Sequence, residues 1–524
     1  MPRQLIGVLL LAFAIAQHPD AGAAFDAFWA AESPAAASRL VDDIVRSGVT
    51  FDDAYRTLRR GRNYPARATG MVRLINRPAV GPGSVDHHFV LNVPASYDPA
   101  RKYQARFQLH GGVGGRRTNE PPPNAGGVGA LEGPGDIAQI YIVPFAWSAS
   151  PWWSTDQVLN LRAILDTTKR LYNVDENRVV VSGVSDGGTG AYYLAMRETT
   201  EYASFLPLNG YWLVLASGDI QRGGGPLYPN NLRNKPFFVV NGGRDPLYPS
   251  DHVDPYIAHF KKGGVTVDYR PQPEAAHNTR WWPEVKDGFE TFVREHPRNP
   301  LPDTLTWETG DPTEFNRAHW LVITSLWHAR GEATALPDLN DMIDPPSPDF
   351  GVRSVGSRIN RVMPGSNADR IGLKPGDAIV RLNDESVRVT VDLDEVFESL
   401  EPGSAITLLV ARNNAPVELT GRYELQMVTR PPRQVFDRTL PSGRVDLTRS
   451  GNTVSATTRG VGGFTLLLSP DQFDFSKPVK VIANGKTVFD GKVQKDLRTL
   501  LKYAALDNDR TMLFGADVHV DLTR

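Results

Sequence analysis

Hydrophobic and polar positions alternate along the chain in two rhythms, short β-rich runs and longer segments with helical spacing. Between residues 66 and 300 strand-like runs alternate with helical segments, and Gly/Pro loops separate them. Strands are predicted at 86–93, 104–109, 139–143, 178–182, 236–240 and 265–270. Helices are predicted at 155–171, 189–198, 253–262 and 283–294. Because strands that alternate with helices favour parallel pairing, we expect a doubly wound, mostly parallel α/β sheet.

The pattern changes on both sides of this region. Residues 25–65 are rich in Ala and Arg at helical spacing and predict a helical lead-in. Residues 301–345 contain two strand-like runs, 304–308 and 319–326, and then a Pro/Asp-rich linker.

The last part of the chain, residues 430–524, is β-rich. It contains VKVIANGKTVFDG, in which Asn484-Gly485 between alternating apolar positions predicts a hairpin. We expect this segment to join the strands of residues 301–330 in one β domain, with the intervening compact unit inserted between them.

The N-terminal sequence MPRQLIGVLLLAFAIA has the order of a secretory signal. Arg3 precedes an apolar run, and residues 14–16 form an A-x-A cleavage site. We therefore predict a signal peptide over residues 1–16, with residues 21–23 as a later cleavage option, and export to the periplasm or the medium. The alternative is a short membrane anchor. No transmembrane span is expected after cleavage, because the rest of the chain has no apolar run of sufficient length.

Composition excludes several kinds of chemistry. The 524 residues include no Cys, which excludes disulfides, a thiol nucleophile and Cys-based metal sites. None of the 11 His lies in a metal-ligand spacing, so no metal site is expected. A net charge of −2 gives no support to nucleic-acid binding.

One stretch indicates catalysis. In RVVVSGVSDGGTGAYYLA a β-branched strand leads into Gly-Val-Ser-Asp-Gly and then into a helical segment. Gly183 and Gly187 flank Ser185 where side chains would collide with the neighbouring strand and helix. This context predicts that Ser185 is a nucleophile on a sharp turn.

A nucleophilic Ser needs a base and a group that orients the base. Asp245 follows the strand predicted at 236–240, and His277 lies in the loop after the strand predicted at 265–270. The remaining downstream His residues lie too near Asp245, inside a helix, or beyond the last helix. We therefore predict Asp245 as the orienting acid and His277 as the base.

The oxyanion site is expected after an early strand. RFQLHGGVGGRR ends a strand at Leu109 and continues into a Gly-rich loop. We expect backbone N–H donors from Gly112 or Val113 and from Asp186, the residue after the nucleophile. The carboxylate of Asp186 is unusual there, because it adds negative charge beside a developing oxyanion.

Together these motifs resemble the α/β-hydrolase family over about residues 66–295. Within it they resemble secreted esterases similar to polyhydroxyalkanoate depolymerases and feruloyl or acetylxylan esterases, with prolyl-oligopeptidase-like peptidases close behind. The resemblance implies a serine hydrolase that cleaves carboxylic esters through an acyl-enzyme, without a cofactor.

Aromatic residues occur in two of the loops expected above the sheet. Trp153 follows the strand at 139–143, and Trp281 and Trp282 follow His277. We predict that they contact substrate as an apolar wall. The alternative is that they pack over the loops.

Residues 346–425 resemble a PDZ domain of the type found on bacterial periplasmic serine proteases. The resemblance rests on VMPGSNA at 362–368 and GLKPGDAI at 372–379. It implies binding of a peptide carboxylate by strand addition, with Phe350, Gly351 and Val352 as the binding loop. The alternative is a PDZ domain that only spaces or regulates the other parts.

Three functions stay open at this point. The first is an exported serine esterase, and the second is a serine peptidase whose PDZ domain recruits substrate C-termini. The third is a non-catalytic binding protein in which the hydrolase fold is a scaffold. The same three catalytic residues would serve an ester or a peptide bond, so the sequence leaves the substrate undecided.

Overall fold

The computed structural model describes residues 20–77, 85–116, 138–218, 220, 225–327, 337–342, 347–387, 397, 400–429, 431–438 and 440–523. The segment predicted as a signal peptide, residues 1–16, lies outside them. The chain forms two compact units, Met1–Asn340 with Val435–Arg524 and Asp341–Gln434. Among the helices of the described ranges, none has the length and apolar character needed to cross a membrane.

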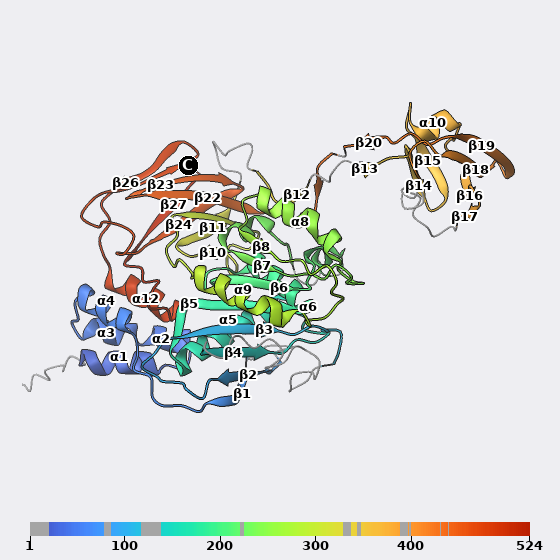
Figure 1. Ribbon diagram of the computed structural model, residues 1–524. Coiled ribbons are helices and arrows are strands. Elements are labelled where there is room, and N and C mark those ends of the chain that lie inside the picture. Colours follow the sequence, from blue (N-terminus) through green and yellow to red (C-terminus); the bar gives the residue numbers. More distant parts are fainter. Residues whose placement is uncertain are drawn as a thin grey trace, which may run out of the picture. The chain divides into compact units, whose positions relative to one another are not determined.

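An eight-stranded sheet forms the centre of the larger unit (Figure 1). In spatial order its strands are β1 (Gly70–Asn76), β2 (His87–Val93), β4 (Gln139–Pro144), β3 (Tyr103–Leu109), β5 (Val174–Val184), β6 (Ser204–Leu208), β7 (Phe237–Val239) and β8 (Val267–Tyr269). β1 and β2 are antiparallel to their neighbours, and the other pairs are parallel. β3, β4 and β6 are buried along their whole length, as expected of strands covered on both faces.

All six strands and all four helices predicted between residues 66 and 300 are present. The helices are α5 (Thr155–Leu171), α6 (Asp186–Arg197), α8 (Ser250–Lys262) and α9 (Trp282–Glu295). β1 and β6 were not predicted from the sequence. β6 has only five residues and contains Pro207, which weakens a strand pattern. β1 is an edge strand whose residues alternate between half-buried and exposed.

Two further sheets form a β-rich part of the larger unit. One has the order β10 (Arg317–Ala318), β11 (Leu321–Leu326), β24 (Val461–Leu468) and β27 (Ala516–Asp521). The other has the order β26 (Lys486–Gly491), β25 (Val479–Ala483), β23 (Thr453–Arg459), β22 (Gly443–Ser450) and β9 (Thr304–Thr309). β9 pairs with β22 and β11 pairs with β24, so strands from both sides of the smaller unit share their sheets, as the sequence predicted.

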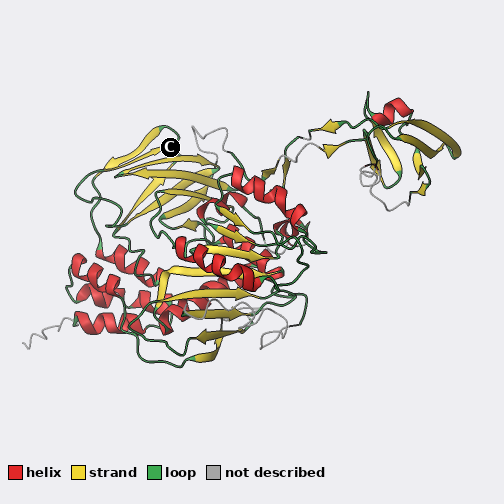
Figure 2. Ribbon diagram, viewed as in Figure 1, coloured by secondary structure: helices red, strands yellow, loops and turns green. Residues whose placement is uncertain are grey.

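β25 and β26 form the expected hairpin, and Asn484 and Gly485 have φ values of 50° and 79°. Two positive φ angles fit a turn whose twist matches that of the strands. The lead-in consists of four helices, which share a hydrophobic core with α12 and lie beside it in Figures 1 and 2. These helices are α1 (Ala21–Ala30), α2 (Pro34–Arg39), α3 (Val41–Arg46), α4 (Phe51–Arg60) and α12 (Leu497–Asp507).

The smaller unit is built on an antiparallel sheet. Its strands are β14 (Val352–Val355), β15 (Arg358–Val362), β16 (Ala378–Leu382), β18 (Ala405–Arg412) and β19 (Ala415–Arg422), and β17 (Glu385–Ser386) pairs with β16. Its short helix is α10 (Asn367–Ile371). Two short ladders flank this sheet along the chain, β12 (Asp341–Met342) with β21 (Arg433–Gln434) and β13 (Ser347–Pro348) with β20 (Met427–Val428).

Candidate active site

Ser185 lies on a sharp turn between β5 and α6. Its backbone has φ 56° and ψ −120°, a conformation that a non-Gly residue adopts at a cost. A Cβ at Gly183 would lie 2.1 Å from the carbonyl oxygen of Gly187, and one at Gly187 would lie 2.0 Å from that of Leu109. The turn therefore requires glycine at both positions, because the strand and the helix meet there backbone to backbone.

Ser185, His277 and Asp245 form one hydrogen-bonded chain. His277 Nε2 lies 2.8 Å from Ser185 Oγ, and its Nδ1 lies 2.6 Å from Asp245 Oδ2. The other oxygen of Asp245 accepts the backbone N–H groups of Leu247 and Tyr248, at 2.8 and 3.1 Å. Since a carboxylate only accepts, Nδ1 carries the proton, and Nε2 is left to accept from the Ser185 hydroxyl.

The loop after β3 lies directly against the nucleophile. A Cβ at Gly111 would lie 3.0 Å from Ser185 Cβ and 3.6 Å from its Oγ. Of the predicted donors, the N–H of Val113 is already bound, because it donates to Asp186 Oδ2 at 2.9 Å. The N–H groups of Gly112 and Asp186 have no hydrogen-bond partner among the residues that the structure describes.

His110 fixes the start of this loop, a role that the sequence analysis did not give it. Its Nε2 accepts the backbone N–H of Ala146 at 3.0 Å, so Nδ1 carries the proton and donates to the Gly111 carbonyl at 2.8 Å. Burial lowers the pKa of His110, which agrees with a neutral ring in this position. The signal for this residue was its place directly after the strand, within His-Gly-Gly.

The predicted tryptophans lie in different surroundings. Trp281 and Trp282 are each 5% exposed and belong to a core cluster with Phe238 and Phe289. Both indole rings are therefore packed almost entirely inside the protein. Trp153 is half-buried.

The structure places the aromatic ring of Tyr248 beside His277. The ring of Tyr248 meets the His277 ring edge to face, with centroids 5.7 Å apart, and Tyr211 lies 5.6 Å from Tyr248. Burial raises the pKa of Tyr248, and the charges of Asp186 and Asp245 raise it further. The sequence signal for Tyr248 was its position three residues after Asp245, but nothing in the sequence pointed to Tyr211.

The three residues predicted for peptide binding lie at the start of β14. Phe350 is buried and stacks on Phe397 with centroids 3.9 Å apart. The N–H of Gly351 donates to Asp349 Oδ1 at 2.7 Å, and Val352 begins the edge strand β14. The side chain of Phe350 and the amide of Gly351 are thus both engaged within the domain.

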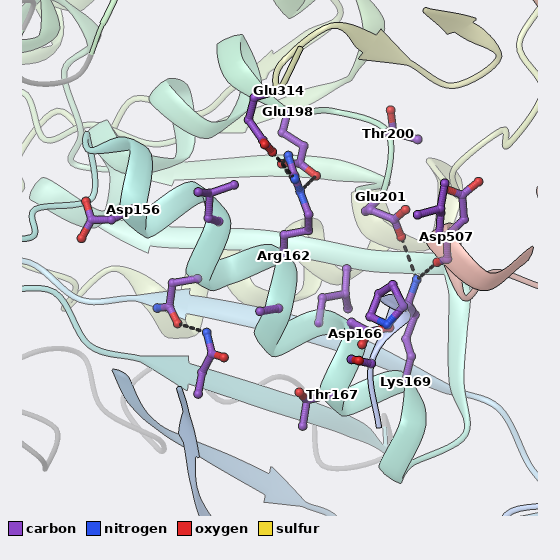
Figure 3. A pocket seen from close by; sticks show the side chains of 18 of the residues that line it. Asp156, Arg162, Asp166, Thr167, Lys169, Glu198, Thr200, Glu201, Glu314 and Asp507 are labelled. Atoms are coloured by element: carbon purple, nitrogen blue, oxygen red, sulfur yellow. Dashed lines mark hydrogen bonds and ion pairs between the residues drawn. The ribbon is translucent and has the colours of Figure 1, made fainter. Parts of the chain in front are cut away.

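A cavity of about 820 Å³ lies along α5 (Figure 3). None of Ser185, Asp245 and His277 lines it. Arg162 is paired with Glu198 and Glu314, and Lys169 with Glu201. The basic groups of Arg162 and Lys169 are thus each bound by a carboxylate of the protein itself. No group of acidic and His side chains suited to a metal ion occurs within the described residues.

The order of the strands decides the fold of the larger unit. β3 lies between β4 and β5, the first two strands are antiparallel to their neighbours, and a Ser turn follows β5. The eight-stranded sheet of the larger unit and its helices have the α/β-hydrolase fold. The larger unit is joined in the chain to a PDZ domain, since residues 358–412 match the PDZ domain family model.

Similar solved structures are esterases of low identity. A thermostable esterase is 19% identical, over 44% of this chain and 63% of that one, less than two thirds of its length, with a TM-score of 0.32. Est1E from Butyrivibrio proteoclasticus is 16% identical over 44% of this chain and 99% of its own, with a TM-score of 0.35. The apo form of Thermogutta terrifontis esterase 2 is 16% identical over 44% and 97%, with a TM-score of 0.34. No curated protein matches the chain.

Proposed function

We propose that this protein is an exported serine hydrolase that cleaves carboxylic esters. The observation that carries the proposal is the chain of hydrogen bonds from Ser185 Oγ through His277 to Asp245. A hydroxyl that donates to an imidazole, which is held in turn by a carboxylate, is the arrangement that activates serine for attack on a carbonyl.

In the first half of the reaction Ser185 Oγ attacks the ester carbonyl carbon. His277 Nε2 takes the hydroxyl proton, and the Asp245 carboxylate stabilises the imidazolium that forms. The N–H groups of Gly112 and Asp186 donate to the oxyanion of the tetrahedral intermediate. When the intermediate collapses, the bond to the alcohol oxygen breaks, and His277 returns the proton to that oxygen.

The second half repeats these steps with water. The acyl group is now bonded to Ser185 Oγ, and His277 takes a proton from the attacking water. Collapse of the second intermediate releases the carboxylic acid, and His277 returns the proton to Ser185 Oγ. The cycle regenerates the enzyme and uses only this chain's own residues.

Activity profiling of the mature protein tests the proposal. The panel holds nitrophenyl esters of increasing chain length, feruloyl esters, polyhydroxybutyrate and chromogenic peptides, with Ser185→Ala as the control. We expect hydrolysis of at least one ester class by the native enzyme and none by the variant. Full esterase activity in Ser185→Ala would refute the assignment of Ser185.

A serine peptidase is the second candidate, favoured by the PDZ match at residues 358–412. PDZ domains bind peptide C-termini by strand addition, so this one would deliver substrate chains to the same three residues. Cleavage of peptides with a free C-terminus, lost when that C-terminus is amidated, would favour the peptidase over the esterase.

A non-catalytic binding protein is the third candidate. A fluorophosphonate probe separates it from the other two, because the probe bonds to an activated serine and ignores an inactive one. We expect labelling of Ser185 in the native protein. Export to the periplasm or the medium is tested by fractionating cells and by determining the N-terminus of the mature chain.

A further inference from the structure

The residue after the nucleophile carries a carboxylate that points back at the neighbouring loop. Asp186 Oδ2 accepts the backbone N–H of Val113 at 2.9 Å. Asp186 is also the first residue of α6, where the helix N-terminus favours a negative charge. The N-terminus of α6 thus stabilises the negative charge of the carboxylate, and the carboxylate also binds the loop through Val113.

Three further contacts hold the same loop. The His110 ring donates to the Gly111 carbonyl at 2.8 Å, and the Trp152 indole donates to the His110 carbonyl at 2.7 Å. Further along, the Gly115 carbonyl accepts the N–H of Ser148 at 3.0 Å. These contacts fix the two ends of the loop, and the bond to Asp186 is the fixed point between them.

Gly112 is left between these fixed points. It has a φ of 68°, a left-handed conformation that glycine adopts without strain, and space for a side chain is open beside it. Its neighbour Gly111 packs against Ser185, and the N–H of Gly112 has no recorded partner among the described residues. The direction of this N–H depends on the peptide planes before and after Gly112. The bond from the Val113 N–H to Asp186 holds the plane between Gly112 and Val113.

We propose that Asp186 is a positioning residue whose carboxylate holds the oxyanion loop through Val113, so that the Gly112 N–H is aimed at the position of the oxyanion. The inference rests on the proposed function, since it gives that loop a role in stabilising the tetrahedral intermediate. It also explains how an acidic residue is tolerated beside a developing negative charge. Its carboxylate accepts the backbone N–H of Val113, while its own N–H stays available to the oxyanion.

Two substitutions separate the hydrogen bond from the charge. Asp186→Ala removes the acceptor, whereas Asp186→Asn removes the charge but keeps an oxygen that can accept from Val113. For a neutral nitrophenyl ester we expect Asp186→Ala to lower kcat by about 10- to 100-fold, less than the roughly 10²- to 10³-fold cost of losing an oxyanion donor outright. KM should change less than kcat, because the interaction is made in the transition state. Asp186→Asn should restore most of kcat.

The matched control is Asp251→Ala. Asp251 is an exposed residue in the first turn of α8, and its replacement is expected to leave kcat unchanged. Values of kcat are referred to sites titrated with a fluorophosphonate, so that a loss of folded protein does not count as a loss of rate. Native kcat in Asp186→Ala, or equal losses in the Ala and Asn variants, would overturn the inference. Full activity in Ser185→Ala would refute the proposed function itself. Native kcat in Asp186→Ala together with an inactive Ser185→Ala would refute only the role of Asp186.

Discussion

Asp245 Oδ2 lies 2.6 Å from Nδ1 of His277, while its Oδ1 accepts two backbone N–H groups of its own loop. All of these partners are donors, so the carboxylate has a single binding mode in which both oxygens accept. The side chain is fully buried, which keeps water from competing for either oxygen. This one residue therefore fixes both the orientation of the imidazole and the nitrogen that carries its proton.

Asp245→Asn is expected to lower kcat by up to about 10⁴-fold with little change in the melting temperature. The amide oxygen would accept from the N–H groups of the loop and turn the NH₂ group toward Nδ1 of His277. The imidazole would then carry its proton on Nε2 and could no longer accept from Ser185. Steady-state kinetics on the best ester of the panel measures this effect, with Asp251→Asn as the control. A kcat within tenfold of the native value would contradict the assignment.

The glycines that flank Ser185 should tolerate no side chain. Gly187→Ala places its Cβ 2.0 Å from the Leu109 carbonyl oxygen, a backbone atom that cannot move away without breaking β3 from the sheet. We expect loss of folded protein or of activity. Gly288→Ala is the matched control, because it lies exposed within α9 with nothing within 4 Å. That change should raise the free energy of unfolding by about 0.5–1 kcal/mol. Thermal unfolding of both variants decides, and a native-like Gly187→Ala would contradict the description of the turn.

Trp282→Ala tests whether this side chain serves the core or the substrate. Its ring packs edge to face on Phe289, 5.0 Å between centroids, inside a buried cluster. We expect a loss of about 3–5 kcal/mol in the free energy of unfolding and an unchanged KM for folded enzyme. Trp153→Ala, at a half-buried position, should cost less stability. A raised KM in Trp282→Ala at native stability would point instead to substrate contact.

Asp496 caps the N-terminus of α12 and should make that helix sensitive to acid. Its carboxylate accepts the N–H and the hydroxyl of Thr499, both at 2.7 Å. Partial burial acts to raise the pKa of Asp496, but the bonds from Thr499 together with the backbone N–H and the charge of Arg498 outweigh it, and the pKa lies below its ordinary value. A depressed pKa means that the stabilisation is complete above the unfolded pKa of about 3.9 and is lost as the pH falls through the folded value.

Asp496→Ala is therefore expected to lower the free energy of unfolding by about 1 kcal/mol near neutral pH and by less near pH 3. Asp496→Asn keeps the cap without a titrating group, so its stability relative to the native protein should rise as the pH falls. Hydrogen exchange of α12 at the two pH values reads out both effects. An equal loss in Asp496→Ala at both pH values would rule out the titration.

The candidate triad could be predicted because a parallel sheet orders its loops. The carboxyl ends of parallel strands lie at one edge, so Ser185, Asp245 and His277, each following its own strand, were expected to meet. The need for glycine on both sides of Ser185 could also be predicted. A Cβ there would collide with residues close in sequence or with one adjacent strand.

The burial of Trp281 and Trp282 and the direction of the Asp186 side chain could not be predicted in this way. Trp281 and Trp282 follow His277 in the sequence, yet they face the core, because α9 begins there and packs against the sheet. The carboxylate of Asp186 turns to Val113, 73 residues away, and no local pattern specifies that partner.

The sequence by itself determined the periodic elements, the turn at Ser185 and the order of the residues that would meet, because these follow from φ/ψ sterics and from the chain direction of each strand. Only the tertiary structure decided which aromatic rings lie beside His277 and which backbone amide the Asp186 carboxylate holds. Those outcomes depend on contacts between distant segments, whose energies are set by packing and burial after the chain has folded.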